Sequence, residues 1–434
     1  MKTYAEVIAY LYDRLPMFTR QGAKAIRPDL ERTLLFCEAL GNPHKRFPSV
    51  HVAGTNGKGS SSHMLASILA AAGYRTGLYT SPHLIDFRER IRIDGRMIPE
   101  AFVKSFVQRH FSLIEKLKPS FFEVTVCMAF DYFAQEEVDV AIIEVGLGGR
   151  LDSTNIIDPL VSLITNIGLD HVDLLGDTLG EIAREKAGII KPYRPVVISE
   201  RQSETEPVFR RIAEERQSPS YFADEQYRVT QRSRVVNGLE LAVEHIRENT
   251  SRTFVLDLTG AYQEKNLLGV LTVVDRLREK GYKINDSQLA TGLRDAASRT
   301  GLKGRWQTLN TNPWTICDTA HNEEGIRAVL QNMEGLEYNA LHVVLGAMKD
   351  KDLSSMLALL PKTAQYYFCA PDMPRAIASE SLCQLAATFG LYGQPFASIE
   401  QAVCCAESAY RPGDLIFIGG STFVVAELLA NRTT

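Results

Sequence analysis

The sequence predicts a two-domain α/β protein in which parallel strands alternate with helices. The chain has 434 residues, more than one hydrophobic core usually supports. Apolar runs such as VDVAIIEV (138–145) alternate with helical patterns, as expected of strands buried on both faces of a parallel sheet. The segment SRTGLKGR is rich in glycine and small polar residues, and it favours a boundary between domains at residues 1–297 and 298–434.

The first domain is predicted to begin with helices at residues 3–14 and 28–40. SVHVAG and RTGLYT predict strands on either side of the helical segment KGSSSHMLASILAAAG, and SPHLIDFRERIRIDG is predicted to be a long functional loop. Helices at 99–118 and 121–136 are expected next. Three further strands are then predicted from the runs VDVAIIEV, LVSLITNI and PVVIS.

Residues 226–258 contain short polar strands, which we expect to form an antiparallel patch on the same sheet. Helices at about 261–280 and 286–297 follow this segment. Beyond the boundary, four apolar runs alternate with helical stretches and predict a second, smaller α/β domain. These runs are WTICD, LHVVLG, YYFCA and LIFIG.

Composition and charge exclude several classes of protein. Hydrophobic residues make up 45% and charged residues 23% of the chain, which excludes a mainly disordered protein. The net charge of −4 provides no general attraction to nucleic acids or anionic membranes. Seven cysteines without a CxxC pair argue against a disulfide framework and a zinc site. The N-terminal segment is predicted to be an amphipathic helix and not an export signal, so we expect a cytoplasmic protein.

The sharpest motif is GTNGKGS, residues 54–60, between a predicted strand and a predicted helix. Glycines let the backbone approach phosphate groups, Lys58 can neutralise their charge, and Ser60 can reach a metal ion. The spacing departs from the general P-loop pattern, because a glycine separates Lys58 from Ser60. The motif predicts a site for a nucleoside triphosphate. The alternative is a glycine-rich turn with a chance lysine.

Polar residues follow other predicted strands at the same edge of the sheet. Glu144 lies at the C-terminal end of the run VDVAIIEV, while Ser81 and His171 follow the ends of two other predicted strands. Open α/β sheets bind ligands at the carboxyl ends of their strands, so these residues predict a magnesium site. The alternatives are a loop-capping glutamate, a turn serine and a histidine satisfied within the core.

Two polar motifs follow predicted strands of the second domain. They are DTAHN (318–322) and GAMKDKD (346–352). Asp318 and His321 are candidates to contact a nucleotide or substrate. DTAHN can also be a helix N-terminus capped by Asn322 ahead of two glutamates.

Taken in order, these motifs together with REKAGIIKP and KGRW resemble the Mur-ligase superfamily. TSPHLIDFRERI and GLGGRLDSTN resemble its dihydrofolate synthase/folylpolyglutamate synthase branch in particular. The resemblance implies a P-loop NTPase-like Mur-ligase central domain and a smaller Rossmann-like C-terminal α/β domain. It also implies an ATP- and Mg²⁺-dependent amide ligase that adds L-glutamate to dihydropteroate and to the γ-carboxylate of reduced folates. The acceptor carboxylate would be activated as an acyl phosphate.

The resemblance assigns roles residue by residue. Catalytic roles fall on Lys58, Lys186 and His321, and the implied metal positions are Ser81, Glu144, His171 and Lys186, with Lys186 carbamylated. Nucleotide contacts are implied for Gly54, Thr55, Asn56, Gly57, Lys58, Gly59, Ser60, Asn266, Arg305 and Asp318. The pterin side comprises Phe122, Leu151, Asp152 and Ser153, and the glutamate side comprises His321 and Ser421. From the residues alone, Lys186 is also compatible with an ordinary helix surface, and Asp152 with a turn cap.

Two departures from the family pattern and three rival functions remain. Lys303-Gly304-Arg305 replaces the common Pro-Gly-Arg, and DTAHN replaces Asp-Gly-Ala-His-Asn, so the loop geometry differs while the charged residues stay. The rivals are a monofunctional folylpolyglutamate synthase, another Mur-type ligase and a P-loop nucleotide switch. We expect a monomer with small-molecule partners and neither nucleic-acid nor membrane partners.

Overall fold

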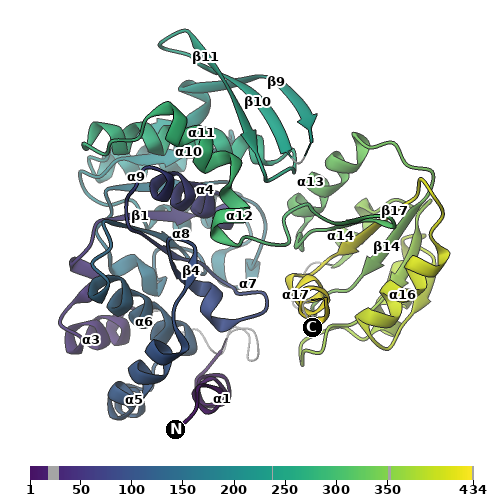
Figure 1. The fold of residues 1–434 in the computed structure, drawn as a ribbon, viewed down its shortest axis with the longest axis horizontal. Helices are drawn as coiled ribbons and strands as arrows, with labels where there is room; N and C mark the ends of the chain where they lie inside the picture. The colour runs from purple at the N-terminus through teal and green to yellow at the C-terminus, as the bar shows by residue number, and fades with distance from the viewer. Residues whose placement is uncertain (18–28, 237, 350–352, 433–434) are drawn as a thin grey trace. The chain divides into compact units, whose positions relative to one another are not determined.

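The computed structural model describes residues 1–17, 29–236, 238–349 and 353–432, and it divides into two compact units (Figure 1). Unit 1 comprises Met1–Gly168, Val172–Asp257 and Gln263–Leu302. Unit 2 comprises Leu169–His171, Leu258–Tyr262 and Lys303–Thr434. The prediction of a two-domain α/β fold is confirmed. The two short segments that join unit 2 lie within the predicted first domain, so the boundary at 297/298 does not describe the whole division.

Unit 1 contains an eight-stranded sheet with the order β4-β3-β2-β5-β1-β6-β7-β8. Strands β2, β5, β1, β6, β7 and β8 run parallel, and β3 and β4 extend the sheet antiparallel at one edge. The bounds are β1 Ser49–Ala53, β2 Thr76–Tyr79, β3 Ile91–Ile93, β4 Arg96–Met97, β5 Val140–Glu144, β6 Val161–Ile164, β7 Val196–Ile198 and β8 Ser220–Phe222.

Helices pack against this sheet through two apolar clusters. One cluster joins α1, α3, α5 and α6 to strands β2 and β5, and the other joins α8 and α9 to β1, β6 and β7. Helix α4 follows β1 and contacts β1, β2 and β5. The bounds are α1 Tyr4–Arg14, α3 Glu31–Ala39, α4 Lys58–Ala71, α5 Glu100–Leu117, α6 Phe121–Gln135, α7 Val172–Leu175, α8 Leu179–Ala187, α9 Glu206–Glu215, α10 Gln263–Glu279, α11 Asp286–Arg294 and α12 Ala296–Thr300.

Two sequence expectations about unit 1 were wrong. SPHLIDFRERIRIDG is not a loop throughout, because it forms the 3₁₀ helix η3 (Phe87–Arg90) and the buried strand β3. Residues 226–258 do not join the main sheet. They form a separate three-stranded antiparallel sheet, β11-β10-β9, from β9 Tyr227–Val235, β10 Gly238–His245 and β11 Thr250–Leu256 (Figure 1).

Unit 2 contains a six-stranded sheet with the order β12-β13-β17-β14-β15-β16 and its own apolar core. Strands β13, β17, β14, β15 and β16 run parallel, and β12 pairs antiparallel with β13. The strands are β12 Gln307–Thr311, β13 Trp314–Cys317, β14 Leu341–Leu345, β15 Gln365–Phe368, β16 Gly393–Pro395 and β17 Leu415–Gly419. The helices are α13 Glu323–Glu334, α14 Leu353–Leu359, α15 Ser379–Thr388, α16 Ile399–Ala409 and α17 Thr422–Asn431.

The strand order brings the predicted motifs of unit 1 to one edge of the sheet. Strands β2, β5, β1 and β6 are neighbours and parallel, so the segments after their carboxyl ends lie side by side. Residues 350–352 of GAMKDKD lie outside the described residues. In the part of the chain that the structure describes, no helix combines the length and apolar character needed to cross a bilayer.

Candidate functional site

The glycine-rich loop between β1 and α4 is packed so closely that two of its glycines cannot carry a side chain. Gly54 has φ 147°, and a Cβ atom there would lie 1.8 Å from Thr165 Oγ1. Gly57 has φ 84°, and a Cβ atom there would lie 2.2 Å from Asn266 Oδ1. Both positions combine a left-handed backbone with a close neighbour, which only glycine tolerates.

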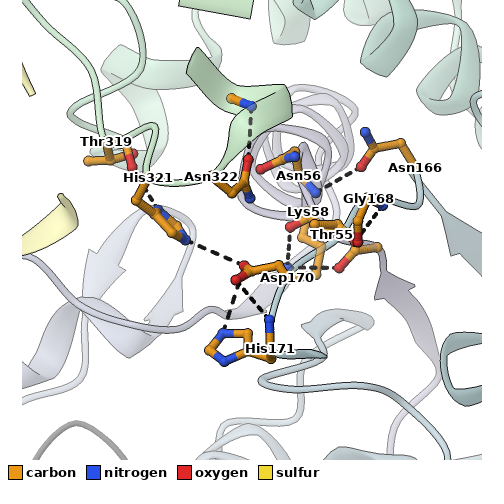
Figure 2. Close-up of polar contacts among 12 residues, drawn as sticks. Thr55, Asn56, Lys58, Asn166, Gly168, Asp170, His171, Thr319, His321 and Asn322 are labelled. Atoms are coloured by element: carbon orange, nitrogen blue, oxygen red, sulfur yellow. Dashed lines mark hydrogen bonds and ion pairs between the residues drawn. The ribbon is translucent and has the colours of Figure 1, made fainter. Parts of the chain in front are cut away.

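Residues just after β6 hold this loop by hydrogen bonds (Figure 2). The Asn56 N–H donates to Asn166 Oδ1 at 2.8 Å, and the Gly168 N–H donates to Thr55 Oγ1 at 3.0 Å. Thr165 Oγ1 donates to the Asn56 carbonyl at 2.5 Å. The loop therefore has a fixed conformation that its glycines permit and the segment 165–168 maintains.

Two lysines donate hydrogen bonds to the same carbonyl oxygen of the loop. Lys58 Nζ lies 2.9 Å from Gly54 O and 2.9 Å from Thr55 O, and Lys186 Nζ lies 3.0 Å from Gly54 O. Lys186 is 4% exposed, so it is not the surface lysine that the sequence also allowed. Two cationic side chains close together at a helix N-terminus create a strong local field for anions.

The start of α10 contacts the loop and the first turn of α4. Gln263 Nε2 donates to Ser60 Oγ at 3.1 Å, and Asn266 Nδ2 donates to Gln263 Oε1 at 2.8 Å. Ser60 and Asn266, both predicted to contact nucleotide, thus lie in one hydrogen-bonded group. Asn266 also abuts Gly57, which places it directly at the loop.

Glu144 and Ser81 come together at the ends of β5 and β2. Glu144 is 4% exposed, and its Oε2 accepts a hydrogen bond from the Ser81 N–H at 3.0 Å. Within the described residues, no three or more His, Cys, Asp or Glu side chains cluster in a way that could hold a metal ion. A single buried carboxylate fits magnesium nonetheless, because this ion commonly binds one or two carboxylates together with water and nucleotide phosphates.

Asp152 organises the loop that follows β5. Its Oδ2 accepts from the N–H groups of Gly146 and Leu147 at 3.0 and 2.9 Å, and its Oδ1 accepts from the backbone N–H and hydroxyl of Thr154 at 2.9 and 2.5 Å. Burial raises the pKa of Asp152, while these donors oppose the shift. All four acceptor positions of the carboxylate are used within the chain. These contacts weigh against direct binding of a pterin, which stays a prediction.

A buried histidine extends this network to β1. His51 Nε2 lies 2.9 Å from Thr154 Oγ1. Because the Thr154 hydroxyl donates to Asp152, it must accept from His51, so Nε2 carries the proton. Burial lowers the pKa of His51 to about 3, and the imidazole is neutral. Sequence reasoning gave His51 no role.

The other predicted pterin-side residues lie near this loop. A Cβ atom on Gly146 would lie 2.4 Å from the Phe122 ring, and the rings of Phe122 and Tyr79 have centroids 6.2 Å apart. Leu151 is half-buried, and Ser153 begins the 3₁₀ helix η4 (Ser153–Ile156). The structure therefore gathers Phe122 and Asp152 around Gly146, while ligand contacts by Leu151 and Ser153 stay predictions.

Asp318 in unit 2 is a buried carboxylate at the end of β13. It accepts hydrogen bonds from the Tyr262 hydroxyl at 2.8 Å, the Trp306 N–H at 2.7 Å and the Ala320 N–H at 2.8 Å. Burial raises the pKa of Asp318, and the charge of Arg305 partly opposes this shift. Arg305 itself donates to the Thr319 hydroxyl. The structure thus groups both predicted nucleotide residues of this unit.

Two histidines of unit 2 approach one carboxylate, that of Asp170 (Figure 2). His321 Nε2 lies 3.6 Å from Asp170 Oδ2, and His171 Nε2 lies 3.8 Å from the same oxygen. The His171 N–H donates to Asp170 Oδ1 at 3.0 Å. His171 belongs to unit 2, whereas Ser81, Glu144 and Lys186 belong to unit 1, so the complete metal set stays a prediction.

Two polar residues of unit 2 cap helices. Asn322 Oδ1 accepts from the Gly325 N–H at 2.8 Å at the start of α13, as the helix-cap interpretation of DTAHN expects. Ser421 Oγ accepts from the Phe423 N–H at 3.2 Å at the start of α17, and Ser421 is 2% exposed. A glutamate contact by Ser421 stays a prediction, and its helix-capping role was missed.

Four residues that support the site were not predicted from the sequence. Thr165, Asn166 and Gly168 hold the loop, and Asp170 lies between two candidate histidines. All four precede His171 in TNIGLDH, directly after β6. Their position after a strand at the ligand-binding edge was the available signal, since the same argument selected Ser81 and Glu144.

Comparisons with known families and structures agree with this geometry. Residues 52–274 match the family described as the Mur ligase middle domain, and residues 304–422 match the Mur ligase glutamate ligase domain. The chain superimposes on the structure of Escherichia coli FolC in complex with DHPP and ADP with a TM-score of 0.84. That comparison has 31% identity and covers 100% of this chain and 99% of that chain.

Curated relatives carry related names. The chain is 34% identical to the dihydrofolate synthase/folylpolyglutamate synthase of Bacillus subtilis, over 87% of this chain and 88% of that protein. It is also 34% identical, over 99% of its length, to a protein of Haloferax volcanii named bifunctional folylpolyglutamate synthase/dihydropteroate synthase. The chain spans about half of that longer relative, 50% of its length.

Proposed function

Because the chain belongs to the dihydrofolate synthase/folylpolyglutamate synthase family of Mur ligases, we propose that it is an ATP-dependent ligase that adds L-glutamate to folates. The main support within the structure is the pair of lysines that donate to the Gly54 carbonyl, in a loop whose close packing and left-handed backbone require glycine. Family relatives bound to ADP support the same nucleotide.

The chemistry of glutamate addition explains why a triphosphate site is needed. A carboxylate is a poor acceptor for an amine, and transfer of the γ-phosphoryl group of ATP to it creates an acyl phosphate with a good leaving group. Attack by the glutamate amine then forms the amide and releases phosphate. Phosphoryl transfer depends mainly on positioning and on neutralising charge. We assign to Lys58 the role of neutralising charge on the transferred group, and its hydrogen bonds to the Gly54 and Thr55 carbonyls support this by holding it at the loop.

Magnesium would be held by Glu144, with Ser81, His171 and Lys186 as the further proposed ligands. It would neutralise charge on the phosphates during transfer. The fit rests on the buried Glu144 carboxylate at the ligand-binding edge of the sheet. Hydrogen bonds within the chain hold the residues around this position. The Ser81 N–H donates to Glu144, and Asn166, just after β6, accepts from the Asn56 N–H of the glycine-rich loop.

Carbamylation of Lys186 is part of this proposal. The amine is buried, and it lies at the loop, where a carbamate would turn a cation into an anionic metal ligand. Peptide mass spectrometry under non-acidic conditions should find the added carboxylate on Lys186. Lys186→Ala should lose activity and regain part of it with a small carboxylic acid. Full activity of the unsupplemented variant would contradict this role.

We further propose that dihydropteroate and reduced folates are both substrates. The relative from Bacillus subtilis carries both activities in its name, and the loop 146–154 resembles this branch of the family. Because Asp152 holds that loop together, Asp152→Ala should lower activity with both substrates to a similar extent. A selective loss with dihydropteroate would instead assign Asp152 to pterin binding.

One assay tests the function and separates it from its rivals. The purified protein is incubated with ATP, Mg²⁺ and L-glutamate, with either dihydropteroate or tetrahydrofolate, and the product mass is recorded. Addition of one glutamate residue to each substrate is expected. Addition to tetrahydrofolate alone would reduce the assignment to a monofunctional folylpolyglutamate synthase. ATP hydrolysis that needs neither folate nor glutamate would favour a nucleotide switch.

A further inference from the structure

We propose that Asp170 is a positioning residue that orients the His321 ring for recognition of the incoming glutamate. This inference rests on the proposed function, in which His321 lies on the glutamate side. Asp170 itself was assigned no role by the motifs. The contact between Asp170 and His321 lies within unit 2 (Figure 2).

The His321 ring has a hydrogen bond at one nitrogen atom and a nearby carboxylate at the other. Nδ1 lies 2.9 Å from the Thr319 carbonyl oxygen. Since a carbonyl oxygen only accepts hydrogen bonds, Nδ1 must carry a proton. This bond fixes one edge of the imidazole and turns Nε2 toward Asp170 Oδ2, 3.6 Å away. Thr319 and Asp170 together therefore define the plane and direction of the ring.

Asp170 is itself held firmly enough to serve as a support. Its side chain is 12% exposed, and its Oδ1 accepts the His171 N–H at 3.0 Å. His171 has φ 53°, a left-handed conformation that is uncommon for residues other than glycine. The backbone of this short segment thus adopts an unusual turn that brings an N–H group to the carboxylate.

The distance between His321 and Asp170 leaves Nε2 available to a ligand. A separation of 3.6 Å allows charge attraction but exceeds the length of a hydrogen bond. The His321 side chain is 32% exposed, so the ring is open to solvent on part of its surface. The Thr319 carbonyl and the Asp170 carboxylate therefore fix the direction in which the part-exposed ring faces an incoming glutamate.

The variants Asp170→Asn and Asp173→Asn form a matched pair for the test. Both remove one carboxylate from the same segment, but Asp173 is exposed on α7 and was assigned no part in the site. Asp170→Asn should raise the KM for glutamate about tenfold, the effect of losing one favourable charge contact. Its KM for ATP and its Mg²⁺ dependence should stay unchanged. Asp173→Asn should behave as the unmodified protein.

A double-mutant cycle shows whether Asp170 acts through His321. If it does, His321→Ala combined with Asp170→Asn should lose no more activity than His321→Ala alone. Multiplied losses would overturn the inference. A weaker Mg²⁺ dependence in Asp170→Asn would also overturn it, because Asp170 would then serve His171.

A spectroscopic readout separates failure of this inference from failure of the proposed function. If the unmodified protein adds glutamate to neither folate substrate, the proposed ligase function is contradicted. The contact between Asp170 and His321 can still be tested in that case. In ¹⁵N-labelled full-length protein, the His321 ring signals are assigned by their loss in His321→Ala. Asp170→Asn should shift the Nε2 signal, while Asp173→Asn should not. An unchanged Nε2 signal in Asp170→Asn would refute the contact.

Discussion

At the scale of single residues, the Gly54 carbonyl oxygen accepts hydrogen bonds from two lysine side chains. Lys58 reaches it from the first turn of α4, and Lys186 reaches it from α8. A carbonyl has two lone pairs and can accept both donors. Both lysine nitrogens therefore lie at the same atom of the loop. This arrangement brings a lysine that lies far along the chain to the glycine-rich loop.

Replacing Lys58 should abolish ligation without unfolding the protein. In the proposed function, Lys58→Ala removes a charge-assisted donor to the transferred phosphoryl group, which should cost roughly 2.7–4 kcal/mol of transition-state stabilisation, or 10²–10³ in kcat. Steady-state kinetics measure the loss, and circular dichroism checks the fold. Lys280→Ala, at the exposed end of α10, is the control and should keep full activity. Near-normal turnover in folded Lys58→Ala would remove Lys58 from the mechanism.

The buried His51 should make the fold sensitive to mild acid. Its pKa is lowered by burial from 6.5 to about 3, so between these values the unfolded chain binds a proton that the folded chain does not. Stability is therefore full above pH 6.5 and falls by up to about 1.4 kcal/mol per pH unit below it. His51→Gln keeps an N–H donor for Thr154 but does not titrate. Denaturant unfolding should show a shallower loss between pH 6.5 and 5 in this variant.

The pH series contains its own control. At pH 8 both His51 and its glutamine replacement are neutral, so any stability difference there reports packing alone. As the pH falls, the unmodified protein loses the stability that depends on neutral His51 and the glutamine variant does not. Any stability advantage of the unmodified protein at pH 8 should therefore shrink. Parallel curves for the two proteins from pH 8 to 5 would show that His51 does not carry this acid sensitivity.

Sequence could name residues but could not say what surrounds them. Glu144 and Ser81 were predicted from their places after strands, and they do meet. Whether Lys186 is buried depends on how α8 packs against the loop, which no local pattern records. Asp152 was predicted to bind ligand, with capping as the alternative, and its four donors within the chain now favour a structural role.

At the scale of elements, the strand–loop–helix unit at residues 49–71 depends on glycine for two separate reasons. One is the left-handed backbone, and the other is the absence of space for a Cβ atom. Gly73, just beyond the other end of α4, separates these reasons. It has φ 89°, and a Cβ atom there would meet no heavy atom within 4 Å, whereas Gly57 has φ 84° and Asn266 Oδ1 at 2.2 Å.

Alanine at these two positions should therefore give different losses. Gly73→Ala should cost only the left-handed strain, about 1–2 kcal/mol of stability, and it should bind ADP normally. Gly57→Ala must also displace Asn266 or the loop, so it should lose most of its ADP affinity. Thermal unfolding and titration calorimetry with ADP measure the two effects. Equal ADP affinity in both variants would show that the close packing at Gly57 is unimportant for the nucleotide site.

Strands were predicted well where burial of apolar side chains alone determines the sequence. Strands β1, β5 and β6 are apolar because helices cover both faces of the sheet, and their runs were recognised. Strand β3 was missed because its segment is rich in charge. Arg90 is nevertheless buried there, with Nε donating to His83 Nδ1 at 2.7 Å, and Arg92 donates to the Gly95 carbonyl at 3.1 Å. Such partners offset part of the cost of burying a charge, although Arg92 Nε has no hydrogen-bond partner among the described residues. Composition does not reveal these partners.

At the scale of the whole molecule, the chain contributes to unit 2 in three places. Segments 169–171 and 258–262 interrupt the parts of the chain that form unit 1, but they belong to unit 2 together with the residues beyond 302. The Tyr262 hydroxyl on Asp318 and the Ala261 N–H on Asn332 Oδ1 show how the second segment is held. A boundary drawn from composition places one cut along the chain, so it could not anticipate these excursions.

Separate apolar cores predict that the two units unfold as separate cooperative steps. Among the described residues, the two clusters of unit 1 given above contain no residue of unit 2, and the cluster of unit 2 draws only on residues 262 and 306–417. The chain has two tryptophans, Trp306 and Trp314, and both lie in unit 2. Tryptophan fluorescence therefore reports unit 2 alone, whereas far-ultraviolet circular dichroism reports the helices of both units.

The two signals should follow different denaturant curves, because non-coincident transitions indicate more than one cooperative step. Buried Trp306, which is 2% exposed, ensures a large fluorescence change when unit 2 opens. ADP at 100 times its Kd should add about 2.7 kcal/mol to a unit that binds it, and the glycine-rich loop lies in unit 1. The circular-dichroism transition of unit 1, which fluorescence does not report, should therefore shift to higher denaturant concentration with ADP. Coincident curves with and without ADP would mean that the 434-residue chain unfolds as one cooperative unit despite its separate cores.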